Sequence, residues 1–423
     1  MVDRRPVLLA VLVWTMTATS FQIFVLAVLA IEIIGDLGLS RAELGLIGSI
    51  NTATGALSAP FTGRLTDRIG AWSAAIVGMV LSAGGMAVMA VAPNALVLSL
   101  SALISGIPQG WGNPTTNALI AERVAPGVRG TITGIKQSGV QFGVFLSGFT
   151  LPTLALWLGW RGALWVYCGA FVAGALATAV SLPRKASWLT DEGSEPDAVS
   201  GVAGGAWVEE RPTPAGVDRA TPKVMDPWIW RLAGYALVMG LVGGVIGRFF
   251  PLWAEEAIGL STARAGLVVA LTGLLGIGAR IVAGRVAEKY VDPPRLLRLL
   301  AAIGGVYALV LLLTPYIGSW VPWPGTVFNA IGIGAWNAVA MLAIIMVVPQ
   351  LLAGRASGVV MLGFLGGLSI SSPIAGWAVD RLGTYQPVWL VCLGLAVMAM
   401  FSLSSSTVTG SGREPSPAVT PSN

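Results

Sequence analysis

Apolar residues fall into twelve long runs along the chain, and short stretches rich in Gly, Pro, Asn and charged residues separate the runs. The first run, 6–31, contains no charged residue. A helix needs about 20 mostly apolar residues to cross a bilayer, and this run is too long for the core of a signal peptide. The pattern predicts an all-α membrane protein with twelve transmembrane helices, over residues 6–31, 43–63, 72–92, 94–121, 130–157, 162–182, 228–254, 262–283, 295–316, 320–349, 356–379 and 385–404.

The runs divide into two groups of six, because residues 183–226 have a different composition. This stretch contains the basic pair Arg184 and Lys185, four acidic residues between 191 and 197, and repeated Pro and Gly. Such a polar sequence does not bury enough apolar surface to fold by itself. We predict an N-terminal six-helix bundle over 1–182, a polar linker over 183–226, a C-terminal six-helix bundle over 227–405 and a disordered tail over 406–423.

The composition excludes several classes of function. The 423 residues are 55% hydrophobic and 11% charged, against about 25% charged in ordinary soluble domains. Histidine is absent, which removes histidine metal ligands and most hydrolase mechanisms. Both cysteines lie inside apolar runs, so neither a disulfide framework nor a zinc site is expected. We therefore expect no enzyme, no bound metal and no cofactor.

The basic residues predict the orientation in the membrane. With twelve spans, eighteen of the 25 Lys and Arg residues lie on the side that carries both termini and the linker, and four lie on the other side. Positive charge is enriched in cytoplasmic loops. We expect a multi-pass protein of the plasma (inner) membrane with both termini and the linker in the cytoplasm. The same rule explains the basicity without nucleic acid as a partner, and we expect a monomer in the lipid bilayer.

The two halves share an internal repeat. Leu158-Gly159, Trp165 and Cys168 recur as Leu382-Gly383, Trp389 and Cys392, each displaced by 224 residues, and Gly63-Arg64 recurs as Gly284-Arg285. Since each half has six predicted spans, both halves begin on the same side and the repeat is parallel. Transporters built from such repeats bind their substrates between the halves.

The segment Gly63-Arg64-Leu65-Thr66-Asp67-Arg68-Ile69-Gly70 resembles the signature loop of the major facilitator superfamily, and Gly284–Lys289 resembles its weaker second copy. The resemblance covers residues 1–405. It implies that Gly63, Arg64, Asp67, Arg68 and Gly70 act in conformational switching on the cytoplasmic side. This copy lacks the family's second basic residue, having Ala71 and Trp72. The alternative is that Arg64 and Arg68 only anchor the cytoplasmic side.

Three ionisable residues fall inside the predicted spans, and all are basic: Lys136, Arg248 and Arg280. Such residues are costly in a bilayer and usually functional. No Asp or Glu lies in the middle of a predicted span, so a cavity between the helices would attract anions.

Lys136 lies about 10 Å deep from the cytoplasmic end of its span. Gln137 and Gln141 share its polar stripe, which we predict to face a cavity. The alternative for Lys136 is snorkelling to the interface.

Arg280 lies at a similar depth in the eighth span. The string Gly278–Gly284 resembles the oxalate/formate antiporter and monocarboxylate transporter branch of the superfamily, in which an arginine before the glycine binds the substrate carboxylate. The resemblance implies that Lys136 and Arg280 meet one carboxylate, with snorkelling again the alternative for Arg280. Arg248 lies in the outer half of its span, as an outer gate or as an anchor beside aromatic residues.

Further polar groups complete the candidate site. Spans four and ten place Trp111 and Asn113 opposite their repeats Trp336 and Asn337. Hydrogen bonding between helices is the alternative role for each of them.

These observations favour a secondary active transporter of a small organic anion, a monocarboxylate above all, working by alternating access as a symporter or antiporter. One alternative is a proton-coupled exporter of drugs or metabolites with an aromatic pocket, for which the 16 tryptophans are an argument. The other is a membrane enzyme, or a sensor that binds a ligand without transporting it, built on the same scaffold.

Overall fold

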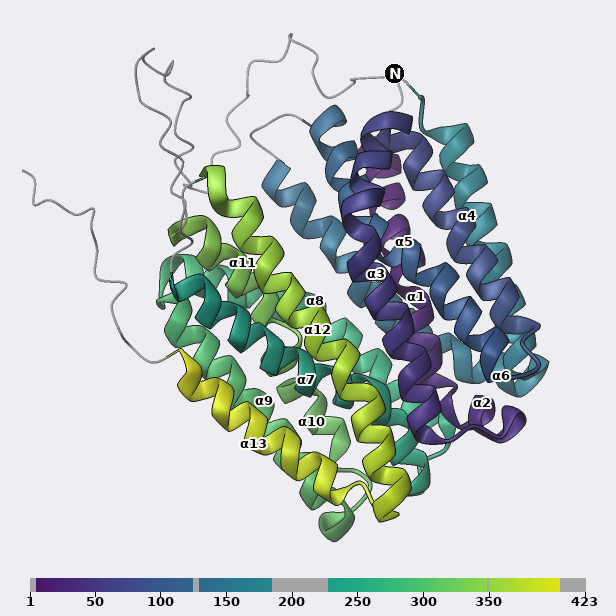
Figure 1. The fold of residues 1–423 in the computed structure, drawn as a ribbon, viewed down its shortest axis with the longest axis vertical. Coiled ribbons are helices and arrows are strands. Elements are labelled where there is room, and N and C mark those ends of the chain that lie inside the picture. The colour runs from purple at the N-terminus through teal and green to yellow at the C-terminus, as the bar shows by residue number, and fades with distance from the viewer. Residues whose placement is uncertain (1–4, 125–128, 185–226, 348–349, 404–423) are drawn as a thin grey trace, which may run out of the picture.

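The computed structural model describes residues 5–124, 129–184, 227–347 and 350–403, which form helices joined by short turns (Figure 1). The first half contains α1 (Arg5–Val28), α2 (Ala30–Leu37), α3 (Arg41–Ile69), α4 (Ala71–Ala90), α5 (Ala95–Arg123) and α6 (Arg129–Ser181). The second half contains α7 (Pro227–Glu256), α8 (Thr262–Lys289), α9 (Pro293–Ile317), α10 (Pro322–Phe328), the π-helix η2 (Asn329–Ile333), α11 (Trp336–Val347), α12 (Gln350–Leu382) and α13 (Gln386–Ser402). The described residues contain no strand, so the all-helical prediction is confirmed. Most of the predicted linker and the predicted tail lie outside the described residues.

Four predicted spans differ in detail from the observed helices. The first ends at Val28, where the short α2 takes over. The fifth and sixth are one continuous element, α6, broken at Gly159, whose φ of 69° and ψ of 165° are not helical. The tenth is divided into α10, η2 and α11, because the backbone widens into a π-helix from Asn329 to Ile333. Irregular backbone at such depth is tolerated where protein or water satisfies it.

The repeat seen in the sequence has a counterpart in the backbone. Gly159 and Gly383 are displaced by 224 residues and have φ angles of 69° and 66°. Gly38 and Gly259 form a second pair, with φ angles of 64° and 68°. Such left-handed angles are favourable only for glycine. Two turns of each half therefore have the same left-handed glycine at equivalent positions.

Many described helices are suited to a bilayer. Nine are long and apolar enough to cross it, when α10, η2 and the adjoining part of α11 are counted as one helix over Pro322–Ile344, and α13 is a shorter apolar helix. Large apolar side chains also lie on the surface, such as Trp157 at 80% exposure and Val180 at 88%. A soluble monomer rarely exposes such extended apolar surface, whereas lipid tails cover it without cost.

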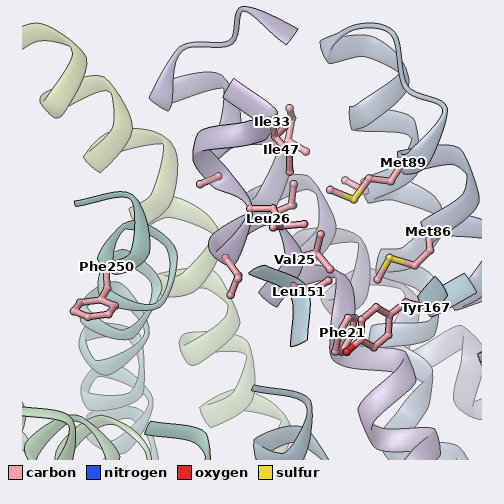
Figure 2. Packing of buried hydrophobic residues seen from close by; sticks show 14 of the residues in the cluster. Phe21, Val25, Leu26, Ile33, Ile47, Met86, Met89, Leu151, Tyr167 and Phe250 are labelled. Carbon is pink, nitrogen blue, oxygen red and sulfur yellow. The ribbon is translucent and has the colours of Figure 1, made fainter. Parts of the chain in front are cut away.

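A cluster of aliphatic and aromatic side chains forms the core of the first half and continues into the second half, where it includes Phe250 of α7 (Figure 2). Phe21 of α1 stacks on Tyr167 of α6 with ring centroids 4.2 Å apart, and it meets Phe171 edge to face at 5.6 Å. Met86 and Met89 of α4 belong to the same cluster. This packing holds α1 between α4 and α6, which fixes the face that α1 presents to the second half.

The most extensive contacts between the halves are those of α3 with α12 and of α6 with α8, and α1 also packs against α7. A methyl group on Gly45 would come within 2.5 Å of the carbonyl oxygen of Ser372, and one on Gly148 within 2.3 Å of the carbonyl oxygen of Gly266. Glycine at these positions therefore allows backbone-to-backbone contact. In Figure 1 the halves converge at the end that carries α2 and diverge toward the end at which α1 begins.

Candidate functional site

A cavity of about 540 Å³ lies between the two halves. The first half lines it with α1, α3, α5 and α6, and the second half with α7, α8, η2 and α12. Much of its wall is apolar, including Phe24, Phe250 and Phe364. Its polar side chains come from both halves: Ser20, Thr52, Gln109, Asn113, Gln141, Arg248, Thr272, Arg280 and Asn329.

The charge of the cavity has one sign. Arg248 and Arg280 line it, and no Asp or Glu is among the described residues of its wall. Two guanidinium groups with no acidic neighbour raise the electrostatic potential inside a low-dielectric space. The cavity therefore favours anions and repels cations.

Arg248 of α7 lies about 12 Å along the helix from its last residue, Glu256. It is 5% exposed, and its Nη1 is buried with no hydrogen-bond partner among the described residues. Its guanidinium lies against α3 at Gly48, where a methyl group would be 1.6 Å from Nη1. A buried donor without an acceptor is costly, and because Arg248 also lines the cavity, its guanidinium is a candidate to bind an anion there.

Arg280 of α8 lies about 14 Å along the helix from Lys289, at the opposite end of the cavity from Arg248. Its Nε donates to the carbonyl oxygen of Gly334, directly after η2, at 2.9 Å. The two Nη groups have no acceptor among the described residues. The carbonyl oxygen of Gly334, directly after the π-helix, thus binds the guanidinium at Nε, and both Nη groups remain available to a ligand.

Lys136 is placed differently from what the polar stripe predicts. It is fully buried and is not part of the cavity wall. Its Nζ donates to Asn113 Oδ1 at 3.0 Å, Thr116 Oγ1 at 3.0 Å and Asn117 Oδ1 at 2.7 Å, all on α5. Neutral oxygens from the neighbouring helix thus satisfy the ammonium, and it lies behind the wall rather than in it.

The other residues of the stripe divide between wall and support. Gln141 lines the cavity and contacts Gly276 of α8. Gln137 is outside the wall and donates through Nε2 to Asn113 Oδ1 at 3.2 Å. Asn113 itself lines the cavity. The structure therefore brings together Asn113, Gln141, Arg248 and Arg280, four of the residues selected from the sequence.

The repeated tryptophans lie in the cores of the halves and not in the cavity wall. Trp111 is buried and donates through Nε1 to Thr66 Oγ1 at 2.7 Å, inside the signature segment. Trp336 is buried against Tyr235 and Phe364. Asn337 has one side-chain partner among the described residues, Met361, with Nδ2 3.5 Å from the sulfur. The large apolar area of the two indole rings explains why both tryptophans are buried in the helix packing rather than placed in a polar site.

The signature segment is the last part of α3 rather than a loop. The helix continues through Gly63 to Ile69 and ends at Gly70, whose φ is 81°. Arg64, Asp67 and Arg68 are exposed, and none of them has an ion pair with another described residue. The segment thus has no ion pair with the described residues of the second half in this conformation.

A polar cluster that the sequence reading missed joins the halves at the end that carries α2. We name it the latch, and it consists of Arg41, Glu256, Asp380 and Tyr385. Arg41 pairs with Glu256 at 2.7 Å and with Asp380 at 3.3 Å. Tyr385 donates to Glu256 and accepts from Arg41 Nε at 3.2 Å. Only the position of these residues at predicted span ends was visible from the sequence, because ends carry no spacing that reveals partners.

A second ion pair at the same end is internal to the first half. Arg161, just after the break in α6, pairs with Asp36 of α2 and stacks on Trp160 at 4.2 Å from the ring centroid. The hydrogen bond from the Arg161 guanidinium lowers the pKa of the Asp36 carboxyl below its usual range. This pair holds the α2 corner to the first half, and it does not bridge the halves.

A helical bundle in two halves with a cavity between them is typical of membrane transporters. The family model of the Major Facilitator Superfamily matches residues 10–369, and the chain belongs to this family. Human monocarboxylate transporter 11 is 28% identical over 380 residues, which cover 86% of this chain and 74% of that protein. The gallate transporter of Pseudomonas putida is 25% identical over 72% of each chain. The crystal structure of a D-xylose-proton symporter has the same fold, with a TM-score of 0.73, 15% identity and coverage of 94% and 96%.

Proposed function

We propose that this protein is a secondary active transporter of a small organic anion, a monocarboxylate above all, in the plasma membrane. One observation carries the proposal: the cavity between the halves contains two arginines and, among the described residues of its wall, no acidic side chain. The similarity to a monocarboxylate transporter and to a gallate transporter supports the same class of substrate. Gallate, like other aromatic acids, combines a carboxylate with an apolar ring, and the cavity offers arginines and phenylalanines.

We further propose twelve spans in two parallel-related bundles, with both termini and the linker in the cytoplasm. Nine described helices have the length and composition of spans. Division of α6 at Gly159, and addition of the more polar α3 and the shorter α13, give six spans in each half. The equal left-handed turns in the two halves support the parallel relation. In this orientation the latch is on the outer side, and the conformation is closed outward and opens toward the cytoplasm.

Uptake into liposomes tests the function. Purified protein would be reconstituted and given radiolabelled lactate, pyruvate, benzoate and gallate, with a cationic dye as comparison. We expect carboxylate uptake that falls in Arg280→Gln and Arg248→Gln, with KM raised about 10-fold or more, the usual effect of losing a hydrogen bond to a charged group. Arg264→Gln is the matched control, since Arg264 is exposed and outside the cavity wall.

Three results contradict the proposal. Undiminished carboxylate uptake in both arginine variants removes the site. Export of the cationic dye without carboxylate uptake favours a drug exporter, for which the phenylalanines of the wall are the supporting feature. Binding of a carboxylate without any flux favours a sensor.

A further inference from the structure

Lys136 is 0% exposed, the lowest value among the charged side chains that the structure describes in the first half, and its surroundings indicate its protonation state. An ammonium group has three N–H donors and no acceptor. Its three side-chain partners on α5 lie at 3.0, 3.0 and 2.7 Å, and each offers an oxygen. The geometry matches a protonated lysine whose donors are all used. Lys136 therefore has no donor left for a substrate.

Asn113 is the one partner of Lys136 that lines the cavity. Its Oδ1 accepts from Lys136 Nζ at 3.0 Å and from Gln137 Nε2 at 3.2 Å. A side-chain amide has one acceptor oxygen with two lone pairs and one NH₂ group with two donors. Two donors therefore occupy the oxygen fully. The reversed amide would bring an NH₂ group against an ammonium, so only one orientation is compatible with these neighbours.

This orientation decides what Asn113 offers to the cavity. With Oδ1 held by Lys136 and Gln137, the exposed branch of the amide is Nδ2, a donor. Asn113 lies about 15 Å along α5 from Arg123, and Arg280 lies about 14 Å along α8 from Lys289. Both helix ends are on the same side of the molecule. The two halves thus present an amide donor and a guanidinium at similar depth on opposite walls.

We propose that Lys136 is a positioning residue, which binds no substrate itself and fixes the Asn113 amide so that Nδ2 donates to an acceptor oxygen of the bound anion. The first half then recognises the substrate through a neutral donor, and the second half through the arginines. The proposal rests on the proposed function and names the substrate contact of the first half. It also explains why a buried cation without an acidic partner is retained beside the cavity, since the ammonium forces the direction of a group that does reach the cavity.

A double-mutant cycle separates this role from direct binding. Uptake by liposomes would be measured for wild type, Asn113→Leu, Lys136→Met and the double variant, with the carboxylate of the lactate, pyruvate, benzoate and gallate panel that is taken up fastest. We expect each single variant to raise KM about 5- to 20-fold with less change in the maximal rate, and the double variant to be no worse than Asn113→Leu. If the fold-increase of KM in the double variant equals the product of the two single fold-increases, the proposal is overturned, because Lys136 then contacts the substrate independently of Asn113.

Two further variants separate positioning from a structural role. Asn113→Asp keeps the ammonium paired but replaces the donor toward the cavity by a carboxylate oxygen, so we expect a higher KM than in Asn113→Leu. Asn117→Leu is the matched control, because Asn117 also accepts from Lys136, at 2.7 Å, and is outside the cavity wall. A KM in Asn117→Leu as high as in Asn113→Leu overturns the proposal and indicates a structural lysine.

Failure of the proposed function has a different signature. If the protein moves a neutral sugar or a cationic dye but no carboxylate, the anion assignment is wrong. The KM of wild type, the two single variants and the double variant is then measured with that solute. If no solute is moved, the same cycle is measured from the melting temperatures of the purified proteins. A decrease caused by Lys136→Met that is smaller in the Asn113→Leu background than in wild type supports the contact between the two side chains. Equal decreases in both backgrounds overturn the proposal.

Discussion

The guanidinium of Arg41, at the first residue of α3, lies 2.7 Å from the carboxylate of Glu256, at the last residue of α7. Asp380, near the end of α12, accepts from the backbone N–H of Ala42 at 2.9 Å and also pairs with Arg41. One arginine and one helix N-terminus of the first half are thus held by two acids of the second half. The latch closes the outer end of the cavity in the orientation that we propose.

We expect Arg41→Gln to shift the population toward an outward-open state. Glu256 and Asp380 lose their common cation, and a partly exposed ion-pair network of this kind contributes about 1 kcal/mol, which is about a 5-fold change in the ratio of the two states. Single cysteines introduced at Thr52 and at Thr272, both in the cavity wall, would be labelled faster by a membrane-impermeant thiol reagent added from outside.

Arg264→Gln controls for the change in net charge, because Arg264 is exposed at the start of α8 and forms no ion pair with another described residue. Its labelling rates should equal those of the parent. Equal rates in Arg41→Gln would show that the latch does not limit outward opening. High salt should reduce the difference between Arg41→Gln and the parent, since it screens partly exposed charges.

The α6–α8 contact gives a second prediction about outward closure. A methyl group on Gly148 would lie 2.3 Å from the carbonyl oxygen of Gly266 and 2.6 Å from the backbone nitrogen of Ala270. Backbone atoms cannot move aside as a flexible side chain does, so Gly148→Ala must separate the helices. We expect the maximal rate of uptake to fall at least several-fold, because α6 and α8 can no longer close against each other.

Gly169→Ala is the matched control, as Gly169 lies on the same element, α6, with open space around its Cα. In a helix this change is neutral or slightly stabilising. If Gly148→Ala, at an equal amount of protein in the membrane, has the uptake rate of wild type, transport does not require the close contact of α6 with α8.

The fold was readable from the sequence because its signals are local. Twenty-residue apolar runs and turn glycines are set by the bilayer and by backbone sterics, and Gly159 with Gly383 marks the repeat in letters and in φ angles alike. The π-helix at Asn329–Ile333 carries no such signal, since its residues are as apolar as those of a regular span. It was therefore not predicted.

The site was readable only in part. The unpaired cations could be found by their charge, and Arg248 and Arg280 do line the cavity. The partners of Lys136 could not be found, because whether an ammonium faces a cavity or three neutral oxygens depends on the rotation of α6 against α5. The latch was missed for the same reason: Arg41 and Asp380 are 339 positions apart and meet only through the tertiary fold.

Arg280→Lys tests whether the fork of the guanidinium is needed beyond its charge. Arg280 donates through Nε to Gly334 and keeps its two Nη groups for a ligand. A lysine keeps the charge but has no planar fork and cannot donate at both places with the same geometry. We expect KM for the transported carboxylate to rise about 10-fold, less than in Arg280→Gln. A KM equal to that of wild type would show that a point charge is sufficient.

Gly48→Ala tests whether the position of the Arg248 guanidinium against α3 matters, without changing the arginine itself. A methyl group at this position would lie 1.6 Å from Nη1 and 2.1 Å from Cζ, so the guanidinium must move. If Arg248 binds the anion from its position against Gly48, Gly48→Ala should raise KM as Arg248→Gln does. The double variant should then have no higher KM than Arg248→Gln alone. Gly234→Ala, on α7 itself with open space around its Cα, should leave KM unchanged. A Gly48→Ala protein with the KM of wild type would mean that Arg248 binds the substrate from another position or not at all.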